Sequence, residues 1–255
     1  MATVLIPLPS RDFDPTETGV PWRTLQARDH TVVFATPDGR SGQADSKMVS
    51  GAGLGFLAPL LRADAAGRAA YSEMIQSAQF QHPIAYAEIE AANFDALLLP
   101  GGHAPGMRQY LESAQLQAVT AEFFAQDKPV GAICHGVLLA ARSRGRDGKP
   151  VLFGRKTTAL IKTMELAAWA LTRVYLGDYY RTYPMTVEDE VRAALADAGD
   201  FLAGPLPLRR DSPERLDIGF TVRDGHYLSA RWPGDAHRFG AEFAAMLAER
   251  RSQAA

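Results

Sequence analysis

The sequence predicts an α/β fold in which a mostly parallel sheet is covered by helices on both faces. Short apolar runs end abruptly in glycine or proline, a pattern typical of buried parallel strands. Amphipathic segments alternate with these runs along most of the chain, as expected when helices connect parallel strands. No linker, repeat or low-complexity tract interrupts the 255 residues, so we expect a single domain over 1–255.

The predicted strands share apolar or β-branched residues bounded by turn residues. They lie at 3–8, 31–36, 94–100, 130–133 and 156–160. Two further strands, at 220–223 and 227–230, flank Asp224-Gly225, a strong signal for a small C-terminal hairpin.

The predicted helices carry apolar residues at helical spacing. They cover 15–28, 56–61, 68–78, 113–126, 136–141, 163–175, 187–198 and a final segment from Asp235 to about Arg250. The less regular stretches 40–83 and 173–184 are expected to be decorations on the domain.

Composition argues against several classes of partner. The net charge of −2 predicts no general attraction to nucleic acid or to an anionic membrane. No apolar run reaches the roughly 20 residues of a membrane helix, and the first residues lack a signal-peptide pattern. One cysteine excludes an internal disulfide. We therefore expect a cytoplasmic protein acting on a small molecule.

A glycine cluster at 51–55 resembles a nucleotide-binding loop, but such a loop must follow a strand within a βαβ unit. Residues 45–50 do not form a strand pattern, so we expect a flexible loop there. The sequence predicts neither a nucleotide cofactor nor a metal.

The only cysteine, Cys134, lies where a predicted strand meets a predicted helix, and it precedes His135-Gly136. This is the setting of a nucleophile elbow, where a sharp turn places the reactive atom at the carboxyl edge of the sheet. The positive end of the helix dipole favours an ionised thiol, and His135 could take or return a proton. The alternative is a cysteine that is merely a small buried hydrophobe.

A second candidate element is Gly101-Gly102, at the end of the strand at 94–100. Backbone N–H groups of Gly102 and His135 would meet at the same sheet edge and could form an oxyanion hole. The alternative for the two glycines is an ordinary strand-end turn.

Residues 99–103 (LPGGH) followed by 132–136 (AICHG) resemble the ThiJ/PfpI superfamily of the class I glutamine-amidotransferase-like clan, and are most similar to its stress-chaperone and glyoxalase III branch. The resemblance implies a flavodoxin-like three-layer sandwich and a Cys134–His135 pair. It also implies that Glu17 is a protonated acid against the sulfur. Glu165 stands where that branch places a carboxylate that orients the histidine; the alternative is an ordinary helix-start acid.

The chain also departs from the glutaminase members of that clan. Those members place a glutamine shortly after the nucleophile and a C-terminal His-Pro-Glu, and both are missing here at 134–138 and 231–235. Ammonia transfer from glutamine is therefore not expected. The candidate pocket residues are Gly101, His103, Tyr180, Arg231 and Trp232. For the aromatic segment around Tyr180, the alternative is a packing or subunit surface, since tyrosine is enriched at interfaces.

Three functions remain open on these residues. The first is an enzyme that acts on reactive carbonyls through a Cys134 thiolate, with His135 and Glu17 moving protons. The second is an amidase or peptidase that forms an acyl-thioester. The third is a non-enzymatic stress chaperone or redox sensor. The resemblance favours a homodimer without cofactor.

Overall fold

A seven-stranded sheet forms the centre of the computed structural model, which describes residues 1–254, with side chains up to residue 250. The strand order is β5-β3-β1-β6-β7-β9-β8, and every pairing is parallel except β8 with β9. The strands of this sheet are β1 Thr3–Pro7, β3 Thr31–Thr36, β5 Ile84–Ala85, β6 Ala96–Leu99, β7 Val130–Ile133, β8 Thr221–Asp224 and β9 Tyr227–Ala230. A separate two-stranded sheet pairs β2 (Arg11–Phe13) with β4 (Gln43–Ala44).

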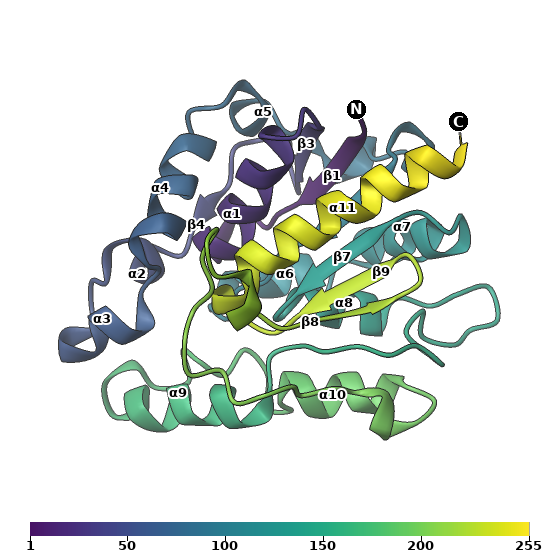
Figure 1. Cartoon of the computed structure of the whole chain (residues 1–255). Coiled ribbons are helices and arrows are strands. Elements are labelled where there is room, and N and C mark those ends of the chain that lie inside the picture. Colours follow the sequence, from purple (N-terminus) through teal and green to yellow (C-terminus); the bar gives the residue numbers. More distant parts are fainter. Residues whose placement is uncertain (255) are drawn as a thin grey trace.

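Helices cover both faces of the sheet (Figure 1). On one face α1 packs against α4 and α11, and on the other α7 and α8 pack against β6 and against each other. Helices α9 and α10 run along the bottom of the view in Figure 1. The helices are α1 Pro15–Gln26, α2 Ser46–Ser50, α3 Ala58–Leu61, α4 Ala65–Met74, α5 Ala78–Gln81, α6 Arg108–Leu111, α7 Ala114–Ala125, α8 Gly136–Arg142, α9 Lys162–Leu176, α10 Val187–Ala194 and α11 Ala236–Ala254.

The predicted α/β class with a mostly parallel sheet is confirmed, as is the hairpin of β8 and β9 around Asp224-Gly225. The strand expected at 156–160 is wrong, because only an isolated bridge joins Thr157 to Phe201. Thr157 and Thr158 instead bond the Ser229 hydroxyl of β9, so this segment is fixed through side chains. The helix expected over 187–198 ends at Ala194, where Leu195 becomes extended.

The glycine cluster at 51–55 follows a helix rather than a strand. Gly51 ends α2 in the left-handed conformation with φ 78°, which glycine adopts without steric cost. The requirement of a nucleotide-binding loop for a preceding strand is therefore not met.

Candidate active site

Cys134 occupies a tight bend directly after β7. Its φ is +58°, a left-handed backbone conformation that non-glycine residues rarely adopt. A Cβ at Gly136 would lie 2.2 Å from the Leu99 carbonyl oxygen, so the turn into α8 passes too close to β6 for any other residue. Strained residues of this kind concentrate at functional sites.

Glu17 reaches this bend from the first turn of α1. The Asp14 side chain caps that helix by accepting hydrogen bonds from Thr16 N (2.8 Å) and Glu17 N (3.0 Å). Glu17 is fully buried, and its Oε2 accepts the Gly101 N–H at 3.0 Å. Oε1 makes no hydrogen bond of ordinary geometry, and the Glu17 carboxyl group interacts with the Cys134 thiol. The structure thus places the expected acid beside the expected nucleophile.

Burial, reinforced by the charge of Asp14, raises the pKa of Glu17 well above its ordinary value. Burial also raises the pKa of Asp14 itself to about 6. Glu17 therefore keeps its proton to a higher pH than an ordinary glutamate does, and it can donate that proton.

The expected ionised thiol is not supported. Burial raises the pKa of Cys134 well above its ordinary value, and the neighbouring carboxyl groups of Glu17 and Asp14 raise it further whenever they are ionised. The hydrogen bond from the His135 backbone lowers the pKa but is the smallest of these effects. Burial and the two carboxyl groups raise the Cys134 pKa more than the helix N-terminus lowers it. The resting side chain is therefore a thiol.

His135 is sealed beneath the bend with no exposed surface. Its Nδ1 lies 3.5 Å from Cys134 Sγ, and its Nε2 lies 3.1 Å from Thr182 Oγ1. The Thr182 hydroxyl donates its one proton to the His103 carbonyl (2.6 Å), so it must accept from His135 Nε2–H. Burial lowers the pKa of His135 to about 3. The ring is thus neutral, and its unprotonated Nδ1 faces the thiol.

Glu165 does not orient His135. Its Oε2 accepts the Val187 N–H at 2.8 Å, and its Oε1 lies 3.5 Å from the Arg181 guanidinium. Burial raises the pKa of Glu165 to about 7. Thr182 takes the place beside the imidazole that the resemblance assigned to this carboxylate.

A second histidine, His103, lines the same cavity as Cys134. Its ring stacks on Tyr180, with centroids 4.2 Å apart and planes inclined by 12°. Its Nε2 lies 3.7 Å from Asp45 Oδ2, and the Tyr179 hydroxyl donates to the same Asp45 carboxylate. Burial lowers the pKa of His103, and the charge of Asp45 opposes that shift.

Asp45 and Thr182 escaped the sequence analysis, which considered Tyr179 as a pocket wall only together with the rest of the aromatic segment around Tyr180. They lie in the segments 40–83 and 173–184, which have no clear periodicity and were expected to be decorations. The second segment instead covers the site, where Arg108 of α6 donates to the Thr182 carbonyl. The concentration of Tyr179, Tyr180 and Tyr183 was the one available signal.

The cavity above Cys134 has a volume of about 280 Å³. Of the expected pocket residues, His103, Tyr180 and Trp232 line it, and so does Gly102, which was expected in the oxyanion hole. Gly101 instead donates to Glu17, and a Cβ there would lie 2.6 Å from Glu17 Oε2. Arg231 points elsewhere: it pairs with Asp235 (2.9 Å) and donates to the carbonyls of Ala203 and Pro205.

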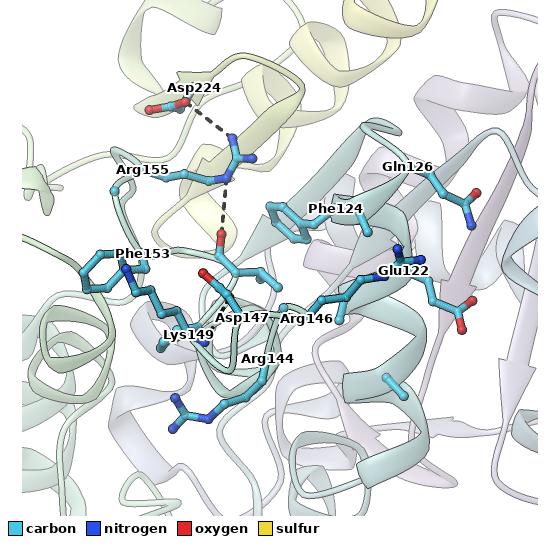
Figure 2. Close-up of a pocket in the computed structure, with 17 residues that line it drawn as sticks. Glu122, Phe124, Gln126, Arg144, Arg146, Asp147, Lys149, Phe153, Arg155 and Asp224 are labelled. Carbon is cyan, nitrogen blue, oxygen red and sulfur yellow. Dashed lines mark hydrogen bonds and ion pairs between the residues drawn. The ribbon is translucent and has the colours of Figure 1, made fainter.

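A larger cavity of about 990 Å³ lies at the opposite, amino edge of the sheet, between α7 and the loop 144–155 (Figure 2). Its lining carries Arg144, Arg146, Lys149 and Arg155 but no cysteine or histidine. Within residues 1–254, no group of three histidine, cysteine or acidic side chains is placed to hold a metal ion. No helix in that range is long and apolar enough to cross a membrane.

Comparisons with known proteins show which family this chain belongs to. A family described as ThiJ/PfpI family-like matches residues 8–205. A deglycase of Thermococcus kodakarensis is 30% identical over 64% of this chain and 69% of its own length. Protein/nucleic acid deglycase 2 of Escherichia coli is 43% identical, over 29% of this chain and 38% of its own.

Among solved structures, glyoxalase III of Candida albicans superposes with a TM-score of 0.68 at 16% identity, covering 96% of this chain and 97% of its own. At that identity the likeness concerns the fold alone.

Proposed function

This chain belongs to the ThiJ/PfpI family, and we propose that it is a cysteine-dependent enzyme of the glyoxalase or deglycase type that acts on reactive carbonyl compounds. The observation that carries the proposal is the pairing of Cys134 with a protonated Glu17 on the floor of one cavity. Rearranging a small carbonyl adduct requires an acid or base beside the reacting sulfur, and Glu17 occupies that position.

In the proposed first step, Cys134 Sγ adds to the aldehyde carbon of a vicinal dicarbonyl. The thiol proton passes to the carbonyl oxygen as the S–C bond forms, so the adduct is a neutral hemithioacetal. No imidazolium forms at His135, because burial lowers the pKa of that side chain to about 3. The oxygen of the adduct is held by the N–H groups of Gly102 and His135. Gly101 is not a candidate donor because its N–H already bonds Glu17.

The second step moves a proton between the two carbons of the adduct through an enediol. We assign this transfer to Glu17 and His103, since both line the cavity while His135 lies beneath it. Asp45 stabilises a proton on His103, as a carboxylate stabilises a charged imidazole in hydrolases. Water then releases a hydroxy acid from the thioester without glutathione, which makes the enzyme a glyoxalase III-like lyase.

The alternatives are supported less well. An amidase or peptidase needs a histidine oriented by a carboxylate, whereas the partner of His135 is the Thr182 hydroxyl. A redox sensor needs an exposed cysteine of low pKa, whereas the Cys134 thiol is buried and its pKa is raised.

The test is incubation of the purified protein with methylglyoxal, followed by measurement of lactate. We expect lactate from the wild type and none above background from Cys134→Ala, whose fold is checked by circular dichroism. Equal lactate from both proteins would contradict the proposal. Release from amide substrates that depends on Cys134, without lactate, would favour the hydrolase instead.

The same proposal includes a homodimer in the cytoplasm. Sedimentation velocity should give twice the chain mass of 27.7 kDa. A monomer over the whole range of working concentrations would remove the dimer from the proposal and leave the chemistry intact.

A further inference from the structure

On the premise of the function proposed above, we infer that the site prefers carbonyl compounds with an apolar substituent larger than methyl. The cavity over Cys134 has two unlike parts, a polar floor and apolar walls. The reacting carbonyls require only the floor. The walls must therefore be explained by another part of the substrate.

The floor is built from the loops at the carboxyl edge of the sheet. It presents Asp14, Glu17, Gly102, His103 and Cys134 to the cavity. These groups supply the nucleophile, the acid–base groups and an oxyanion donor of the proposed reaction. All of them act on the two adjacent carbonyl carbons of the substrate.

The walls come from four separate parts of the chain that converge above the floor. Their apolar members are mostly leucine, methionine, alanine and proline, and they lie within 48–61, 160–171, 207–208 and 232–233. A binding cavity lined mainly by apolar side chains, with a few convergent polar groups, is typical of sites for ligands that are themselves largely apolar.

Three of the wall leucines are left open to water. Leu60 is 64% exposed, Leu171 54% and Leu208 80%, and they belong to α3, α9 and the loop after residue 205. Exposed leucines from three segments around one cavity form an apolar patch. Binding of a ligand that covers this patch is favourable because it removes apolar surface from water.

Two charged side chains in the wall are already engaged. Glu165 bonds the Val187 N–H and pairs with Arg181. The Arg210 guanidinium lies 5.2 Å from the Trp232 ring centroid and donates to the Arg62 carbonyl, while its charge acts on Asp14 and Glu17. Its Nη1 is buried without a partner, so an acidic substituent is the competing interpretation, and the test includes one.

The experiment compares three dicarbonyls that differ only in their substituent: methyl, isobutyl and carboxyethyl. We expect the isobutyl compound to exceed methylglyoxal in kcat/KM by about ten- to fiftyfold, chiefly through KM, since three buried carbons contribute this much. Equal values for the methyl and isobutyl compounds, or preference for the carboxyethyl compound, would overturn the inference.

Two substitutions on one helix provide a matched pair. Leu171→Asp places a charge on the cavity wall and should reduce the isobutyl preference to less than threefold. Val174→Asp lies about one turn further along α9, at a position 91% exposed and outside the cavity lining, and should leave the preference unchanged. If Leu171→Asp instead alters the sedimenting mass and keeps the preference, the leucines form a subunit contact and the inference fails.

A binding measurement separates this inference from the proposed function. Isothermal titration calorimetry measures the binding of isobutyl methyl ketone and of acetone to the Cys134→Ala variant. Tighter binding of the larger ketone without any turnover of dicarbonyls by the wild type would overturn the proposed chemistry and support the apolar site. Turnover by the wild type with equal ketone binding would overturn the apolar site alone.

Discussion

The two cavities at opposite edges of the sheet differ in size, charge and burial. The amino-edge cavity is the larger, about 990 Å³ against about 280 Å³, and it carries four cationic side chains (Figure 2). The carboxyl-edge cavity holds a cysteine, a histidine and three buried acids, Asp14, Glu17 and Glu165. The comparison teaches that the volume of a cavity does not identify a reactive site.

What separates the two cavities is how their polar groups are satisfied. At the amino edge, Arg155 donates to the Val151 carbonyl and pairs with Asp224 at 3.6 Å, while Arg144 donates to the Gly148 carbonyl. At the carboxyl edge, burial shifts the pKa of Asp14, Glu17 and Cys134 upward. Clustered shifts of this kind, in a cleft, are characteristic of functional sites.

The largest expected effect comes from Glu17→Gln. The amide keeps an acceptor for the Gly101 N–H but removes the acidic proton, so kcat/KM for methylglyoxal should fall by roughly 10²–10⁴-fold. The matched control is Glu122→Gln at the amino-edge cavity, which should retain wild-type activity. Comparable losses in both variants would break the contrast between the two edges.

A smaller loss is expected from His103→Gln. Without this imidazole the proton transfer between carbons slows, and kcat should fall about ten- to a hundredfold while KM changes little. The pH profile of kcat should lose its histidine limb, an effect that a purely structural role would not produce. His226→Gln, at a histidine paired with Asp127 far from Cys134, is the control.

The Glu165 carboxyl should make the stability of the folded protein depend on pH. Its pKa is raised to about 7, so the folded state binds a proton that the unfolded state releases, and stability is lost as pH rises. Between pH 6.5 and 8, the unfolding free energy of the wild type relative to Glu165→Gln should fall by about 1 kcal/mol. Urea denaturation of both proteins measures this difference, in which histidine contributions cancel. A constant difference would show that the carboxyl is ionised throughout.

The smallest effect is expected at the amino edge. Arg144→Ala and Arg146→Ala should change kcat/KM by less than twofold, because both side chains lie at the sheet edge opposite Cys134. Steady-state kinetics with methylglyoxal provides the check. A loss above tenfold in either variant would link the larger cavity to catalysis.

The sequence predicts the floor of the site better than its surroundings. Parallel strands β6 and β7 are neighbours, so Gly102 and Cys134 at their carboxyl ends had to meet. Glu17 was placed by family resemblance, because no local pattern links α1 to the bend. Glu165 has the expected position along the chain, yet its side chain turns toward Arg181 and Val187 instead of His135. Spacing alone does not determine which way a helix faces.

The remaining members of the site could not be predicted for a physical reason. Asp45 and Thr182 lie in irregular segments, where hydrogen bonds to side chains rather than periodic packing fix the backbone. Thr182 is held by Arg108, and Asp45 caps α2 through Lys47 N. Partnerships of this kind depend on three-dimensional proximity, which apolar periodicity does not encode.

One part of the wall of the small cavity lies outside the residues that the family model matches, and this bears on which substrates the cavity accepts. Pro207, Leu208, Arg210, Trp232 and Pro233 all follow residue 205, where the family match ends. The bend at Cys134 depends on Gly136 and on its close approach to the Leu99 carbonyl, whereas these later loops only line the cavity. Exchanging this short stretch of chain near the C-terminus would therefore change which substrates the cavity accepts and leave the reacting groups in place.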